Sequence, residues 1–335
     1  MFALTDQKYF SQAEKSRNQR LPGFIFPADS YTITPVIKAI LGLIILVNGL
    51  FAYRLIADLI RHKSEVWREP GSNVFFAFLG VVSQFLGTFG ISDFAFNAVA
   101  FRLTKTVEDK KIPGTLNAAC VIPVAFMALA YITVIRIEVF TLVVLIIAQT
   151  TGSYLMPRIV VKLPVRRIRM GIAVGLLCAA AFILAGKLQL IPSGGDLTGL
   201  PGIRLAVAAA AVFIYGALNN IGIGSYAPTM ATVYALGIDP RVAFPIMMGG
   251  CTFSCAVGAM EFIRLGGYGR KPTLWISVAG LVGVAAAVYL VKRMDVDVIK
   301  WVVFVVVLYA ALDLLFKEFR LKKAARTNLP ACSEQ

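Results

Sequence analysis

Long apolar runs separated by short polar segments dominate this chain, and several runs reach the ~20 residues that a helix needs to cross a hydrocarbon core. A first span is expected at 35–59, before the polar segment RHKSEVWREPGS. The pattern then gives a long run, a break, a short apolar piece and three spans, and this order occurs twice. The first set is 73–91, a break at Ser92 and Asp93, 94–104, 112–134, 137–157 and 168–185. The second is 203–223, a break at Gly224 and Ser225, 226–236, 241–263, 273–291 and 296–316.

The second set repeats the first at a constant offset of 132 residues, which indicates an internal duplication. At this offset Gly90-Ile91 matches Gly222-Ile223, Phe94-Ala95 matches Tyr226-Ala227, and Pro113 matches Pro245. We therefore expect an all-α polytopic membrane protein with duplicated repeats and one extra N-terminal helix. Its expected segments are a polar N-terminal tail (1–34), the extra transmembrane helix (35–60), repeat 1 (72–185), repeat 2 (203–316) and a basic C-terminal tail (317–335).

Each broken unit is too long for one straight crossing of the membrane. At a rise of about 1.5 Å per residue, its long part extends about 28 Å and its short part about 16 Å. A re-entrant hairpin, which returns to the side it left, fits these lengths better. Each repeat then has three crossings, and an odd number inverts the second repeat relative to the first, as in many transporters.

The distribution of Lys and Arg favours this topology. With re-entrant hairpins and the N-terminus outside, the inner segments carry 19 basic residues and the outer segments 11. Full crossings with the N-terminus inside give 16 and 14. The net charge of +15 is therefore explained by cytoplasmic loops and anionic headgroups, and nucleic-acid binding is not expected. We expect seven crossings and a cytoplasmic C-terminus.

A helix break in lipid is tolerated only where the freed backbone groups line a protein-walled cavity. Gly222 and Gly224 allow close approach, Ser225 is a good N-cap, and Pro228 suits the first turn of the restarted helix. In the first break Ser92 or Asp93 is expected to be the cap. The sequence therefore predicts a helix N-terminus in mid-membrane, twice.

Two such N-termini at the repeat interface would bind a small anion, because each offers unpaired N–H groups and about half a positive charge. The alternative is that the glycines only permit tight helix packing; the duplicated breaks favour the binding site. The candidate binding residues at the breaks are Gly90, Ser92, Asp93, Phe94, Gly222, Gly224, Ser225, Tyr226 and Ala227. Further candidate donors, for which hydrogen bonding between helices is the alternative, are Thr115, Asn117, Asn219 and Asn220.

Asp93 is a carboxylate inside the membrane, which is costly and commonly functional. Two roles stay open. It could be a structural N-cap stabilised by its own helix dipole, or a proton-coupling site that is neutralised when an anion lies nearby.

The stretches GISDFAFNAVAFRL…IPGTLN and GALNNIGIGSYAPTMATVYALGIDPRVAFPIMMGG resemble the two signature stretches of the TauE/SafE sulfite exporter family (toluene-sulfonate uptake permeases), over most of residues 72 to 316. At the first break this chain has Ser92, Asp93 and Phe96 where the family pattern suggests Gly-Ser and Pro. The resemblance implies transport of sulfite or small organosulfonates, usually outward, across the bacterial inner membrane. A channel for anions and a carrier for a small carboxylate are the alternatives.

Other chemistry has weaker support. His62 is the single histidine and no nucleophile–base pair is visible, so neither an enzyme, a metal nor a cofactor is expected. Cys251 and Cys255 share a helical face, where they could hold a soft metal or react with sulfite-derived sulfur, but free cysteine is more often a small core residue. Arg54 and Asp58 are expected to pair at i, i+4. Arg102 either extends to the interface or attracts anions at the mouth of the site. The oligomeric state is not predicted.

Overall fold

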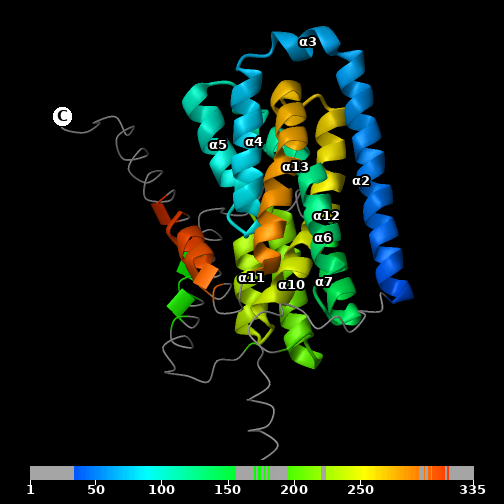
Figure 1. The fold of residues 1–335 in the computed structure, drawn as a ribbon, viewed down its shortest axis with the longest axis vertical. Coiled ribbons are helices and arrows are strands. Elements are labelled where there is room, and N and C mark those ends of the chain that lie inside the picture. The colour runs from blue at the N-terminus through cyan, green and yellow to red at the C-terminus, as the bar shows by residue number, and fades with distance from the viewer. Residues whose placement is uncertain are drawn as a thin grey trace, which may run out of the picture. The chain divides into compact units, whose positions relative to one another are not determined.

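The computed structural model describes residues 34–155, 195, 197–219 and 224–293, and scattered residues within 170–184 and 298–316. The described chain is helical, with a single β-bridge between Leu197 and Ile238. The two expected tails, most of the span at 168–185 and part of the span at 296–316 lie outside the described residues. The helices (Figure 1) are α2 (Pro35–Arg61), α3 (Lys63–Arg68), α4 (Asn73–Thr88), α5 (Asp93–Thr104), α6 (Ile112–Ile132), α7 (Val139–Leu155), α10 (Gly202–Asn219), α11 (Tyr226–Ala235), α12 (Pro240–Arg264) and α13 (Arg270–Arg293).

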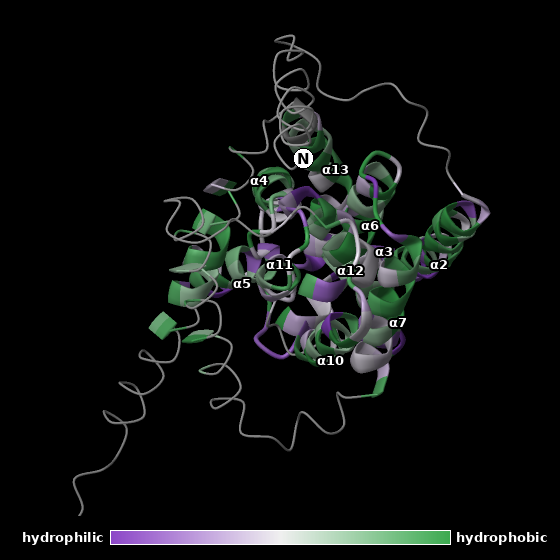
Figure 2. Cartoon of the chain, turned by 90° about the horizontal axis from the view of Figure 1, so that it is seen from below, coloured by the Kyte–Doolittle hydropathy of each residue, from purple (hydrophilic) through white to green (hydrophobic). Residues whose placement is uncertain are grey.

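These helices agree with the apolar runs of the sequence, except that the polar segment after the first span contains the short helix α3. Within the described residues, α2, α6, α10, α12 and α13 are long and apolar enough to cross a membrane. Figure 2 shows mostly hydrophobic residues along α2, whose outer side chains are exposed as expected for a lipid-facing helix. These findings confirm an all-α polytopic membrane protein.

Helices α6 and α12 form the centre and pack against each other. Around them, α4 packs on α13 while α10 packs on α7, and α5 packs on α6 while α11 packs on α12. Each of these contacts thus has a counterpart in which every helix is replaced by the equivalent helix of the other expected repeat. This exchange supports the duplication; the duplication itself and the segment boundaries stay predictions.

The two outer pairs, α4 with α13 and α7 with α10, touch backbone to backbone. A Cβ atom on Gly80 would lie 2.8 Å from the Cα of Ile276, and one on Gly283 would overlap the carbonyl of Val81. In the other pair, a Cβ on Gly152 would overlap the carbonyl of Phe213, and Gly216 meets the backbone of α7 in the same way. Small residues permit this close approach of helices in a membrane.

Both broken units return to the end at which they begin, as a re-entrant hairpin requires. Near the start of α4, the ring of Phe76 lies 6.4 Å from that of Phe101, near the end of α5. In the second unit, Leu197, just before α10, exchanges backbone hydrogen bonds with the segment that follows α11. Its N–H donates to Gly237 (3.2 Å), and its carbonyl accepts from Asp239 (3.0 Å).

The loops 61–71, 105–111 and 264–271, all expected inside, meet at one end of the helices. Arg270 Nε lies 2.7 Å from Asp58 Oδ2 and its Nη1 lies 3.0 Å from Glu65 Oε2, while the N–H of Gly269 donates to Thr115 Oγ1 (2.8 Å). Tyr268 donates to Asp58 at 2.6 Å; burial and then this bond raise its pKa well above the ordinary value, so it stays a neutral donor. The expected pairing of Asp58 with Arg54 is wrong, because Asp58 turns toward α13 while Arg54 lies on an exposed face.

The topology gives the first testable prediction. Because three basic loops share one end, we expect that end to be cytoplasmic together with the C-terminus. A fluorescent reporter fused after Gln335 should be active in the cytoplasm, and the same reporter fused after Gly199, in an expected outer loop, should be silent. A reporter after Gln335 that works only outside the inner membrane would contradict the arrangement.

Candidate functional site

The two helix breaks meet. A Cβ atom built on Gly224 would lie 2.5 Å from the hydroxyl oxygen of Ser92. Gly90 has φ +91, which L side chains rarely adopt, and its Cβ would lie 3.0 Å from the methyl group of Met230 on α11. In Figure 1, α4–α5 and α10–α11 lie toward opposite ends of the central helices. The N-terminus of each short helix is therefore directed to a shared region between them.

At the first break, the chain satisfies its own helix start. Ser92 has extended backbone and its Oγ accepts from the N–H of Ala95 at 3.3 Å, which identifies the cap left open above. Asp93 is buried, and its carboxylate accepts from Nε2 of Gln84 (3.1 Å). The first turn of α5 therefore has a side-chain cap at Ala95 and carries a carboxylate of its own.

At the second break the expected cap is wrong. Ser225 has φ −91 and ψ −9, a helical backbone from which its hydroxyl makes no cap bond. Its Oγ instead lies 3.0 Å from Sγ of Cys251 and accepts from Nε2 of Gln149 at 3.3 Å. Within the described residues no acceptor takes the N–H of Tyr226 or Ala227. Pro228, in the first turn as expected, has no N–H.

The further candidate donors fall in different places. Asn219, at the end of α10, donates from Nδ2 to Sγ of Cys255 (3.1 Å), which is the predicted alternative of bonding between helices. Thr115 joins the start of α6 to the loop at Gly269, away from the breaks. Asn117 donates to the carbonyl of Pro113 within α6 (3.0 Å). Asn220 and Gly222 lie outside the described residues.

Several buried polar atoms have no hydrogen-bond partner among the described residues: Gln84 Oε1, Asn117 Oδ1, Tyr226 OH and Thr229 Oγ1. Burying a donor or acceptor without a partner costs about 1–3 kcal/mol. Among the described residues, Gln84 Oε1 beside Asp93, and Tyr226 OH and Thr229 Oγ1 on α11, are therefore unpaired polar atoms near the two helix starts.

Gln84 and Gln149 are site neighbours that the sequence interpretation missed. Each is an amide in an apolar run, VVSQFLG on α4 and LIIAQTTG on α7, and each contacts the first residues of a short helix. Each also lies where a glycine of a neighbouring helix leaves room, Gly280 for Gln84 and Gly216 for Gln149. A polar amide within a membrane span was the signal that could have found them.

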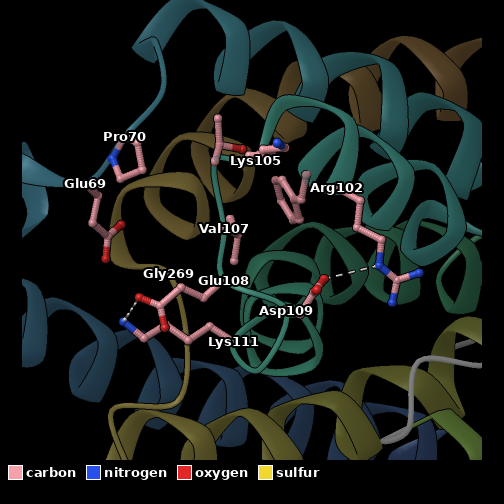
Figure 3. Close-up of a pocket in the computed structure, with 11 residues that line it drawn as sticks. Glu69, Pro70, Arg102, Lys105, Val107, Glu108, Asp109, Lys111 and Gly269 are labelled. Atoms are coloured by element: carbon pink, nitrogen blue, oxygen red, sulfur yellow. Dashed lines mark ion pairs between the residues drawn. The ribbon is translucent and has the colours of Figure 1, made fainter.

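A cavity of about 540 Å³ lies away from the breaks, at the end of α5 (Figure 3). Cations and carboxylates alternate around it, and Arg102 Nε pairs with Asp109 at 3.5 Å on the surface. Arg102 thus lines a cavity away from the helix breaks and already pairs with Asp109. The lining residues are Glu69, Pro70, Phe101, Arg102, Lys105, Thr106, Val107, Glu108, Asp109, Lys111 and Gly269.

Apolar spans and two broken helices whose ends meet inside the bundle are typical of membrane transport proteins. Residues 204–333 match the family described as Sulfite exporter TauE/SafE. This match confirms the resemblance for the second signature stretch and covers most of α10 and all of α11 to α13, including the second break; the first stretch lies outside it. No curated protein and no solved structure matches the chain. The family implies a multi-pass membrane transporter for sulfite or related sulfur anions.

The second testable prediction concerns Ser225. Ser225→Ala removes the hydroxyl that bridges Gln149 and Cys251, but it removes no cap bond. We expect normal insertion and a loss of stability of about 0.5–1.5 kcal/mol, the net value of an ordinary hydrogen bond. Anion affinity should weaken several-fold because the start of α11 loses a contact that holds it. Thermal unfolding with and without sulfite measures both; unchanged anion affinity would contradict a role for this contact.

Proposed function

We propose that this chain is a secondary transporter that moves a small oxyanion, sulfite or a small organosulfonate, across the bacterial inner membrane. Export is the proposed direction, with movement of the anion coupled to movement of a proton in the same direction. The substrate binds between the starts of α5 and α11. The candidate residues at the breaks bind it, whereas Thr115 is better explained as a structural contact.

The observation that carries the proposal is a difference between the starts of α5 and α11 in how their backbone N–H groups are bonded. At α5, Ser92 caps the N–H of Ala95 and Asp93 places a carboxylate in the first turn, while the N–H groups of Tyr226 and Ala227 on α11 have no acceptor among the described residues. Free N–H groups at a helix start bind anions, and the helix dipole adds about half a positive charge there. The open start of α11 supports an anion as the substrate.

Asp93 supports proton coupling. An ionised carboxylate in the first turn of α5 would repel an anion held at α11, because little water screens charges at this depth. A proton on Asp93 removes this repulsion. Binding of the anion and of a proton are then favourable together, which links their movement.

The test is a screen of anions against the purified full-length chain. Sulfite and methanesulfonate should raise the unfolding temperature with micromolar to millimolar affinity, because a ligand at 100 times its Kd stabilises by about 2.7 kcal/mol. Stabilisation by cations or neutral solutes and by no oxyanion would overturn the proposal, and preference for acetate would replace sulfite by a carboxylate. Flux into liposomes then separates a carrier, which saturates, from an anion channel, which conducts ohmically.

A further inference from the structure

Three buried cysteines lie directly behind the second break. Cys120 lies on α6, and Cys251 and Cys255 lie on α12, at the contact between these central helices. The sulfur of Cys251 lies 3.0 Å from Ser225 Oγ and accepts from Nε2 of Gln149 at 3.2 Å. The thiol of Cys251 therefore contacts Ser225, the residue that precedes α11.

The three thiols have polar neighbours. Cys255 lies one helical turn after Cys251 on α12, and its sulfur accepts from Nδ2 of Asn219 at 3.1 Å. The S–H of Cys120 donates to the carbonyl of Asn117 (3.3 Å). The hydroxyl of Tyr226, a residue that is 4% exposed, has no hydrogen-bond partner among the described residues. Apolar packing alone does not require the contacts of Cys251 with Ser225 and Gln149 or that of Cys255 with Asn219.

Thiols recognise a different kind of anion from hydroxyl and amide groups. A thiol is a weak hydrogen-bond donor with a large polarisable atom. The oxygens of a fully oxidised anion such as sulfate need strong donors on every side, and an oxygen facing sulfur is left poorly paired. An anion with a lone pair or charge on sulfur instead presents a weak acceptor to which the S–H of a thiol can donate, so no strongly accepting oxygen is left facing a weak donor.

We propose that Cys120, Cys251 and Cys255 form a soft wall of the anion site that selects anions with an exposed reduced sulfur atom over fully oxidised oxyanions. Sulfite, through its sulfur lone pair, and thiosulfate, through its terminal sulfur, are the class it accepts. Ser225 and the open start of α11 hold the oxygens, and Cys251 lies nearest to them. This inference rests on the proposed function, because it names the substrate class of the same site.

The experiment compares sodium thiosulfate, sodium sulfite and sodium sulfate as ligands of the purified full-length chain by thermal unfolding and calorimetric titration. The unmodified protein should bind thiosulfate and sulfite at least about tenfold more tightly than sulfate. In Cys251→Ser and Cys255→Ser this preference should fall to about twofold or less, because a hydroxyl is the stronger donor to oxygen. If Cys251→Ser does not fold, Cys251→Ala is used in its place, and the same fall in preference is expected.

Ser277→Ala is the matched control. Ser277 on α13 donates to the carbonyl of Ala119, so this variant loses a buried hydroxyl at the back of α6 without removing a thiol. Its preference should equal that of the unmodified protein. Equal binding of sulfate and thiosulfate by the unmodified protein, or full preference in the cysteine variants, would overturn the soft wall while leaving anion transport intact. Failure of every anion to bind the unmodified protein would overturn the proposed function instead.

Discussion

Gly224→Val is expected to reduce sulfite transport by more than about tenfold, with the protein still inserted in the membrane. The Cβ of any side chain at Gly224 would lie 2.5 Å from Ser92 Oγ, so either Ser92 would have to give up its cap bond to Ala95 or the two breaks would have to separate. A loss of about 1.4 kcal/mol in binding already corresponds to a tenfold change. Uptake of radiolabelled sulfite into liposomes containing the purified variant measures the effect.

Gly42→Val provides the matched control for this substitution. Gly42 lies on α2, and a Cβ atom there would meet nothing within 4 Å. The same chemical change should therefore leave transport at the level of the unmodified protein. Normal transport by Gly224→Val would show that the breaks serve helix packing alone.

Asp93→Asn is expected to keep anion binding and to lose flux driven by a pH gradient. The amide oxygen of asparagine can still accept from Gln84 Nε2, and the cap at Ser92 is untouched, but the side chain no longer exchanges a proton. Exchange of labelled for unlabelled sulfite without a gradient should continue. Uptake driven by a pH gradient should fall at least about tenfold, a change equivalent to 1.4 kcal/mol.

Ser92→Ala separates structure from coupling at the same break. It removes the bond to the N–H of Ala95 and should cost about 0.5–2 kcal/mol of stability. Its transport should still respond to pH, because the carboxylate remains. A pH-dependent flux that survives in Asp93→Asn would leave the structural N-cap as the role of this residue.

The spans and both breaks could be predicted from the sequence because they depend on local properties. Apolar length determines where a helix can cross, so α6 and α12 begin and end within two residues of their apolar runs. At the first break, Ser92 has the right local geometry and caps α5 as its chemistry suggests. The helix starts at Asp93 and Tyr226 were predictable to within one residue for the same reason.

Partners distant in the sequence could not be predicted this way. Ser225 has the same hydroxyl as Ser92, yet it turns to Cys251 and Gln149, whose positions depend on how α7 and α12 pack. Asp58 pairs with Arg270 rather than Arg54 because the start of α13 lies beside the end of α2. The close approach expected at Gly224 is found, since its φ is not positive and a side chain there would meet Ser92, but Ser92 could not be identified in advance as the neighbour.

The backbone contacts between outer helices have a consequence for how the chain is made. Gly80 on α4 finds its partner only in α13, and Gly152 on α7 finds its partner in α10. When the ribosome has produced only the first half, the surfaces of α4 and α7 that later pack against α13 and α10 still face lipid. Assembly must wait for the second half, and contacts between residues so far apart in the chain are slow to form. Each half therefore needs the other to complete its helix packing. A truncated chain would lose the close contacts of both outer helix pairs.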